Sequence, residues 1–465
     1  MNKKKIFDII ENKWDEHLET YKKYIRQPSI SNQGIGVVDM ADLLVKELRE
    51  LGCQEAYLCE TKGWPVVFGK LDVGAEKTML MYGMYDVMPV DGEDWKTPPF
   101  EANIIHDDKF GEVLIGRGAR NQKGPLAALI NSVKTIIDAE GTLPVNLIFL
   151  IEGEEEQGSV NLPYAINELK EELEKADCVF FHAFQAYANE KKVKQYLGTK
   201  GATDVEVRLK GGDWGGPAER HIHAEHAIWV NNPIWELIKA FSTIKGADDK
   251  ILIEGFYDDV VGELDGDKEV LDRLQEIWSP EDWKRDYGVR KFKNDMTPRE
   301  ALENYTFQPE LNIDGIIGGY TGEGIKTLLP HDILIKMDLR TVPNMNVEKT
   351  VNQIKKHFDK IGLSEKIEVT FKNAYGYCRT SQKDPAVQAL FKAQEEMGYV
   401  VEPWASLAGS APLGIFQQEL NMPVVTGGLG HAALPHSPNE FAVVETLKEA
   451  EKCCCLFMYK YAELG

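Results

Sequence analysis

The sequence predicts an α/β protein in which a mixed sheet flanked by helices is interrupted by an inserted α+β domain. Helices alternate with short apolar strands up to Lys200, and the same pattern resumes from Pro385. Such alternation is typical of a sheet covered on both faces. Between these parts, strands such as 203–209 alternate polar and apolar residues, as strands with one open face do. We therefore expect a split domain at 1–202 and 381–465, with the inserted domain at 203–380.

The first part of the split domain begins with two amphipathic helices, because apolar residues recur at helical spacing on either side of a break at Gln27–Ser31. Apolar runs bounded by turn residues predict the strands that follow. In chain order we expect helices at 4–25 and 37–51, strands at 55–59, 65–69, 78–82, 100–105 and 112–115, a helix at 125–140, a strand at 145–151, a helix at 162–173 and a strand at 178–181.

The inserted domain combines alternating strands with amphipathic helices. The expected elements are strands at 203–209, 333–340 and 367–372 and helices at 233–244 and 347–361, with a long charged insertion between 249 and about 308. The last part of the chain continues the split domain with helix 385–397, strand 423–426 and helix 443–461.

Charge and composition exclude several functions. The formal net charge of -22, without a basic patch, argues against nucleic acid and anionic membranes as partners. No segment approaches the roughly 20 apolar residues of a membrane span, and the N-terminus lacks the apolar run of a signal peptide. The seven cysteines show no zinc-finger or thioredoxin spacing, which fits reduced thiols in a cytoplasmic protein. Cys453, Cys454 and Cys455 are expected to lie partly buried on the last helix.

Polar loops follow several predicted strands. They are 83–86, 116–124, 152–159 and 431–440. Loops at the carboxyl ends of strands line the ligand crevice of an open α/β sheet. Glu154, Glu155 and Glu156 repel one another unless cations, hydrogen bonds or protons hold them. They could form an exposed acidic loop, but their position behind a strand favours a functional site.

These loops carry motifs of a known family. Met84–Pro89 resembles HxDxxP, 116–124 resembles GRGxxDxKG, 152–159 matches EGxEExGS, and 436–440 matches HxPNE; segments 220–223, 232–233, 318–327 and 340–343 are also similar. The chain thus resembles the two-zinc exopeptidases that include carnosinases, aminoacylases, acetylornithine deacetylase and carboxypeptidase G, and is most similar to the carnosinase-like dipeptidases. The resemblance implies a zinc-exopeptidase-like catalytic domain and an inserted lid domain that forms a homodimer.

The resemblance also shows which metal ligands have changed. Transferred by position, the bridging Asp is Asn121, the loop His is Met84, and a later carboxylate falls near Ala183, while Glu156 and His436 remain. A thioether is a poor Zn²⁺ ligand, and two dications need a bridging anion to offset their repulsion. We expect no two-zinc centre, and either no metal or one weakly bound zinc or manganese. His182, beside the lost carboxylate, could be a substitute ligand or a core histidine.

Other residues of the family's site are retained. The resemblance implies Glu155 as general base, Asp86 as the acid that orients the loop, and His223 as the lid group that polarises a carbonyl. It implies that Arg340, Ser410, Asn121 and Thr327 bind a small substrate with a carboxylate. His221, His223 and His226 could instead form a surface metal site.

Three functions remain open. The first is an enzyme acting on a small peptide, N-acyl amino acid or related derivative by acid–base chemistry at Glu155, either by hydrolysis or by proton transfer such as racemisation. The second is an ordinary metallodipeptidase with substitute ligands. The third is a non-catalytic binding protein.

Overall fold

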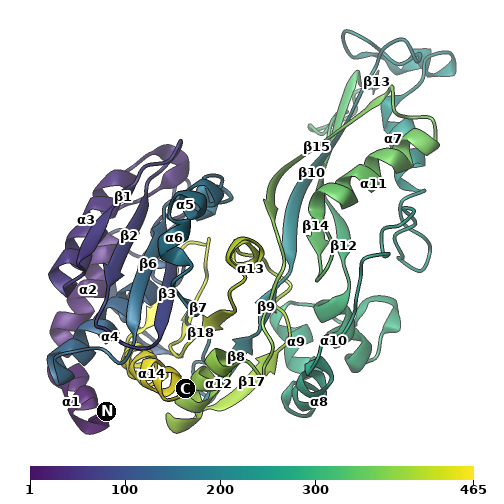
Figure 1. The fold of residues 1–465 in the computed structure, drawn as a ribbon. Coiled ribbons are helices and arrows are strands. Elements are labelled where there is room, and N and C mark those ends of the chain that lie inside the picture. The colour runs from purple at the N-terminus through teal and green to yellow at the C-terminus, as the bar shows by residue number, and fades with distance from the viewer. Residues whose placement is uncertain (465) are drawn as a thin grey trace.

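The computed structural model describes residues 1–464 and contains the predicted mixed sheet (Figure 1). Six strands follow the order β1-β2-β6-β3-β7-β18. Strand β3 is parallel to β6 and β7, whereas β2 is antiparallel to both of its neighbours. The bounds are β1 Glu55–Cys59, β2 Val66–Leu71, β3 Thr78–Met84, β6 Asn146–Glu152, β7 Cys178–His182 and β18 Val424–Gly427.

Helices cover both faces of this sheet because successive strand residues point to opposite sides. Met79 and Met81 join one buried cluster, and Leu80 and Tyr82 join another. The first cluster packs under α1 Lys3–Asn12, α2 Trp14–Arg26, α3 Val37–Leu51, α4 Lys123–Glu140, α12 Pro385–Glu396 and α14 Val444–Glu463. The second lies under α5 Leu162–Glu168, α6 Lys170–Leu173 and α13 Gly414–Leu420.

Two expected helices are each divided in the structure. Helix 4–25 is broken at Lys13 into α1 and α2, and helix 162–173 is broken at Leu169 into α5 and α6. Nothing in the local sequence marks the first break. The break allows Ile10 and Tyr21 both to be buried against the same core. The prediction of single helices was wrong because tertiary packing overrides local periodicity.

Short strands complete this part of the molecule. A four-stranded sheet has the order β19-β20-β5-β4, and two further pairs join β17 to β8 and β16 to β9. Their bounds are β4 Asn103–Asp107, β5 Gly111–Ile115, β8 Lys192–Tyr196, β9 Gly198–Thr199, β16 Cys378–Arg379, β17 Val400–Trp404, β19 Ala432–Ala433 and β20 Phe441–Val443.

The inserted region contains an antiparallel sheet of order β12-β14-β10-β15. Ile333, Ile335, Met337 and Leu339 of β14 are buried, and the residues between them face the other side, as the alternation predicts. The elements are β10 Gly201–Lys210, β11 Ile222–His223, α7 Pro233–Phe241, β12 Glu310–Ile317, β13 Leu328–Leu329, β14 Asp332–Thr341, α11 Val347–Lys360 and β15 Ile367–Tyr375.

The charged insertion contains three α-helices, α8 Asp267–Ile277, α9 Pro280–Asp286 and α10 Pro298–Phe307. Thr297 and Glu300 form a capping box that begins α10. Buried residues of this insertion, including Leu271 and Phe307, share the main core cluster of the split domain, and α8 packs on β17. These helices therefore pack against the split domain, as Figure 1 shows. The division at 202 and 380 stays a prediction.

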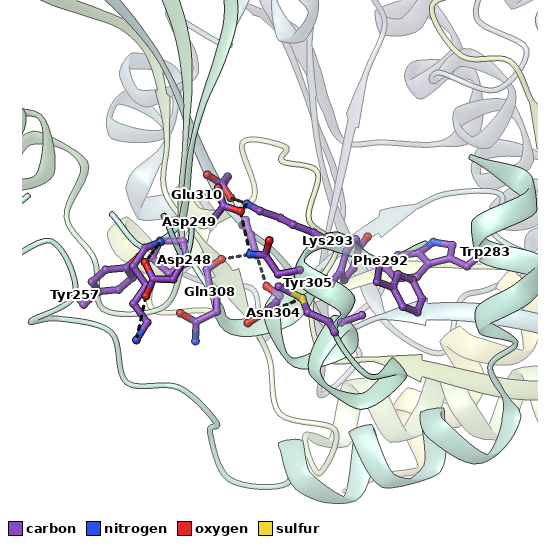
Figure 2. A pocket seen from close by; sticks show the side chains of 16 residues that line it. Asp248, Asp249, Tyr257, Trp283, Phe292, Lys293, Asn304, Tyr305, Gln308 and Glu310 are labelled. Carbon is purple, nitrogen blue, oxygen red and sulfur yellow. Dashed lines mark hydrogen bonds and ion pairs between the residues drawn. The ribbon is translucent and has the colours of Figure 1, made fainter. Parts of the chain in front are cut away.

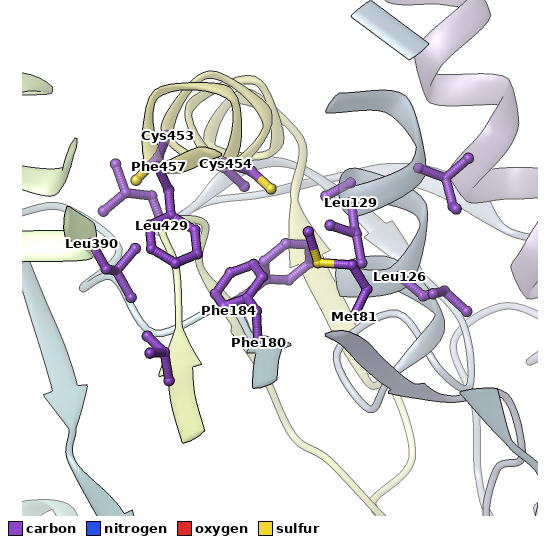
Figure 3. Close-up of a cluster of buried hydrophobic side chains, with 14 of the residues drawn as sticks. Met81, Leu126, Leu129, Phe180, Phe184, Leu390, Leu429, Cys453, Cys454 and Phe457 are labelled. Atoms are coloured by element: carbon purple, nitrogen blue, oxygen red, sulfur yellow. The ribbon is translucent and has the colours of Figure 1, made fainter. Parts of the chain in front are cut away.

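The consecutive cysteines lie on α14 within the main core (Figure 3). They were expected to be partly buried, but all three are fully buried. The other four cysteines are buried as well, and all seven are free thiols. Burial raises the pKa of Cys454 to about 12, so that thiol stays protonated at neutral pH. No helix within residues 1–464 is both long and apolar enough to cross a membrane.

Candidate active site

A cavity of about 510 Å³ lies between loops of the split domain and the open face of the inserted sheet. Five of the predicted site residues line it, namely Glu155, Glu156, Arg340, Ser410 and His436. Asp204, Asp338 and Tyr375 also line it, although the motifs do not point to them. The signal that could have identified Asp338 is its spacing, because residues two apart on a strand face the same side and Asp338 precedes Arg340 by two.

Asp86 organises the two glutamates from beneath. It lies in the loop after β3 and is fully buried. Its Oδ1 accepts a hydrogen bond from the Glu155 backbone N–H at 3.1 Å, and its Oδ2 accepts one from the Glu156 N–H at 3.0 Å. The Ser31 hydroxyl donates to the same Oδ2 at 2.7 Å. Asp86 therefore fixes the backbone of the acidic turn, and burial raises its pKa to about 7.

Glu155 combines a half-buried carboxyl with acidic neighbours. Burial is the largest cause that raises its pKa well above the usual value, followed by the charges of Glu156, Glu152 and Asp86. Tyr375 donates its hydroxyl to the Glu155 carbonyl at 3.2 Å. A carboxyl with a raised pKa can accept and return a proton near neutral pH, as general acid–base catalysis requires.

Glu154 has a structural role beside these residues. It is buried, and its Oε1 accepts a hydrogen bond from the Trp64 backbone at 2.7 Å, while Asn161 donates to both of its oxygens. The carboxylates of Glu154 and Glu156 are thus held by different partners, since Glu156 Oε1 contacts Asn121 and His436 instead. The alternative of an exposed acidic loop was wrong for Glu154.

The residues at the metal positions do not fit a two-metal centre. Asn121 Nδ2 lies 2.7 Å from Glu156 Oε1 and 3.1 Å from His436 Nε2, and the latter two atoms are 3.1 Å apart. Met84 is buried and offers only a thioether. Across the described chain, no three His, Cys, Asp or Glu side chains gather in a way that could hold a metal ion. The bridging anion that two cations require is therefore lacking from this donor set.

Arg117 and Glu440 connect the loops around Asn121. The Arg117 guanidinium contacts Glu440 Oε2 at 3.1 Å and Glu93 Oε2 at 2.7 Å. Glu440 Oε1 accepts hydrogen bonds from the backbone N–H groups of Arg120 and Asn121 at 2.9 and 2.8 Å. Both members of the Arg117–Glu440 pair are buried, so this pair positions Asn121 and the loop that carries His436.

Arg340 lies on the opposite wall of the cavity. Its Nε donates to Asp338 Oδ2 at 2.6 Å, and one terminal nitrogen donates to the Ser410 hydroxyl at 3.0 Å. Asp338 sits directly opposite Asp204 on the neighbouring strand. A guanidinium held at one edge by Asp338 is oriented in advance for a ligand carboxylate, which favours recognition by Arg340.

The remaining predicted residues lie elsewhere. His223 and Thr327 contact each other at 3.1 Å between Nε2 and Oγ1, next to the β11–β13 pair at the far end of the inserted region (Figure 1). Neither lines the cavity in this chain. His221 contacts His331 rather than His226, at 3.3 Å between the Nδ1 atoms.

His182 is buried in the core, and its Nε2 has no hydrogen-bond partner among the described residues. The His182 Nδ1 lies 2.8 Å from the Pro125 carbonyl, and burial lowers the His182 pKa to about 4. Ala183, which follows it, donates its backbone N–H to Gly427 and offers no ligand atom in its side chain.

The buried carboxyl of Glu152 should make the stability of the protein depend on pH. The hydroxyls of Tyr82 and Ser159 donate to its Oε1, and burial raises its pKa from 4.5 to about 8. The folded state therefore holds this proton more tightly, and the resulting stability is present below about pH 4.5 and lost as the pH rises through 8. Relative to wild type, Glu152→Gln should gain on the order of 3 kcal/mol in unfolding free energy between pH 5 and pH 9.

Urea denaturation at the two pH values measures this gain. Glu171→Gln, which changes an exposed glutamate on α6, is the matched control and should show a constant difference from wild type. A pH-independent difference for Glu152→Gln would contradict the prediction.

Comparison with known proteins identifies relatives along the whole chain. The sequence profile of Peptidase family M20/M25/M40 matches residues 80–460. A Cys-Gly metallodipeptidase of Candida albicans is 30% identical over 459 residues, which cover 94% of this chain and 92% of the relative. The human Beta-Ala-His dipeptidase is 29% identical, with 77% of this chain and 71% of the relative covered.

A solved structure has the same fold. It is the M20 family metallo-carboxypeptidase Sso-CP2 of Sulfolobus solfataricus, with a TM-score of 0.86 and 32% sequence identity, covering 96% of this chain and 99% of the other. The similarity extends across the split domain and the inserted domain together, so the resemblance and the fold class predicted from the sequence motifs are confirmed.

Proposed function

Because the chain belongs to peptidase family M20/M25/M40, we propose that it acts on a small peptide, N-acyl amino acid or amino-acid derivative by acid–base chemistry at Glu155. Dipeptides such as Cys-Gly are the first substrates to test, since the relatives are named for dipeptides. The observation that carries the proposal is the placement of Glu155 in one cavity with Arg340 and Ser410. A retained base and a retained carboxylate clamp support an active enzyme over a binding protein.

The chain's own residues support a specific division of roles. Arg340 and Ser410 would bind the substrate carboxylate. The substrate bond next to that carboxylate would then face Glu155 on the other side of the cavity. Glu155, when ionised, would remove a proton from water or from a carbon next to a carbonyl, and its protonated form would return a proton. The first reaction is hydrolysis of an activated bond, and the second is a proton transfer such as racemisation.

We further propose that this chemistry depends on one weakly bound divalent metal or on none. The donor set supports this, because Met84, Asn121 and Ala183 occupy the positions of one metal's three ligands. The alternative is a metallodipeptidase with substitute ligands. If no metal takes part, protein treated with a chelator should keep its full activity on the best substrate of a dipeptide panel. If one weakly bound metal takes part, a single added equivalent should restore any activity that the chelator removes.

Metal analysis of untagged protein accompanies this measurement. We expect well under one equivalent of tightly held metal. A complete loss of activity on chelation that only two equivalents of zinc restore would overturn the metal proposal in favour of the alternative, while leaving the assignment to a peptidase family unchanged.

We propose a homodimer that forms through the inserted domain, because this domain has an exposed apolar surface. Ile325 is 95% exposed, Ile228 84% and Trp229 75%, and all three lie in the inserted region. Large exposed apolar groups of this kind mark interaction surfaces. Sedimentation should give a dimer that Trp229→Lys weakens, and a wild-type monomer would contradict the proposal. The cytoplasmic location stays a prediction.

A further inference from the structure

A second cavity, of about 730 Å³, lies apart from the candidate active site (Figure 2). It is lined by Lys200, which precedes β10, by segment 248–257, by the segments around α9 and α10, and by the beginning of β12, and it shares no lining residue with the first cavity. We propose that this cavity binds an organic carboxylate with an aromatic or large apolar body, with its carboxylate on Lys200. This site is independent of the function proposed for the Glu155 cavity.

Lys200 is the residue on which the anion would bind. Its side chain lines the cavity, yet the residue is only 5% exposed. Its ammonium donates to the backbone carbonyls of Gln308 at 2.6 Å and Asn304 at 3.4 Å, at the end of α10. An ammonium has three donors, so these two carbonyls leave one unused and do not neutralise the charge.

The acidic residues of the cavity are already paired with other lysines. Lys293 lies 3.4 Å from Asp249 and 3.9 Å from Glu310, and Lys250 lies 3.9 Å from Asp248. Within residues 1–464, Lys200 forms no ion pair with a carboxylate. Glu310 acts on Lys200 only at a distance, and a buried cation that no carboxylate contacts directly is costly, so an incoming carboxylate would gain both a charge partner and a hydrogen bond.

Aromatic side chains supply the rest of the site. Trp283 forms edge-on contacts with Tyr305, with ring centres 5.2 Å apart, and lies 6.3 Å from the Phe292 ring. Figure 2 shows these three rings grouped together, apart from the charged pairs of Asp249, Lys293 and Glu310. Such a wall accepts an apolar or aromatic body, while a neutral polar ligand would leave Lys200 unpaired.

The cavity also adjoins the segment that carries Ser410. The Lys200 backbone N–H donates to the Leu407 carbonyl at 3.0 Å, and the Leu407 N–H donates to the Gly198 carbonyl at 2.8 Å. A ligand on Lys200 would therefore lie against the strand that fixes the loop leading to Ser410.

Calorimetric titration with N-acetyl-L-phenylalanine and with its neutral amide tests the site. The Arg340→Met protein is used so that the active-site guanidinium cannot bind the carboxylate. We expect one site that prefers the carboxylate to the amide by about tenfold or more, as a charge-assisted hydrogen bond provides. Equal binding of the two probes, or no binding of either, would overturn the proposal.

Variants in the same background locate the site. Lys200→Met should abolish the preference for the carboxylate and Lys200→Arg should keep it, whereas Lys293→Met, whose charge is already paired, should also keep it. Phe292→Ala should weaken the binding of both probes while leaving the ratio of their affinities unchanged. This variant tests the site even if Lys200→Met fails to fold. Unchanged binding in either Lys200→Met or Phe292→Ala would refute the assignment.

Discussion

Glu155→Gln is expected to lower kcat on the best substrate by about 10³-fold, because glutamine cannot accept the proton that general-base catalysis moves. The substitution keeps the shape of the side chain. It also leaves the hydrogen bonds to Asp86 intact, since those come from the Glu155 backbone. Steady-state kinetics on the dipeptide panel measures the loss, and KM should change far less than kcat, because the Arg340 and Ser410 contacts remain.

Glu168→Gln is the matched control for this experiment. It changes an exposed glutamate on α5 and should leave kcat unchanged. If Glu155→Gln kept activity within tenfold of wild type, acid–base chemistry at Glu155 would be excluded. If wild type and Glu155→Gln both lacked activity on every substrate, the interpretation as a non-catalytic binding protein would be favoured.

Restoring the family's ligands is expected to convert the site into a metal centre. The triple substitution Met84→His, Asn121→Asp and Ala183→Asp supplies an imidazole and two carboxylates beside Glu156 and His436. Strand β3 pairs with β7 in parallel, and Tyr82 lies opposite Phe181. Positions 84 and 183 each come two residues after this pair. The zinc content should rise from well under one equivalent to about two, because a bridging carboxylate then offsets the repulsion between cations.

Elemental analysis after dialysis against zinc and then against buffer alone measures this gain. The matched control, Met84→Leu with Asn121→Gln, alters the same loops without adding a charged ligand and should bind no more zinc than wild type. If wild type itself retained two equivalents, the proposed loss of the two-metal centre would be wrong.

Local patterns explain why much of the fold was predictable. Alternation in β14 and apolar runs in β3 and β6 reflect which face each residue buries, and this information is contained in a few neighbouring residues. The break at Lys13 and the packing of α8 on β17 depend on distant partners, so periodicity alone did not show them. Strand β12 was also missed, because only one of its residues is fully buried.

Motifs were enough to propose the candidate site residues. Met84 and Asn121, and Glu155, Glu156 and His436, are properties of single positions, so they can be compared with a motif one by one. What these groups contact became visible in the folded chain. The tertiary structure placed Asp86 beneath the backbone of the two glutamates, paired Arg340 with Asp338, and separated His223 from the cavity of its own chain. Hydrogen bonds and burial depend on loops far apart in the chain that meet only after folding, and this is the physical reason that local sequence could not specify them.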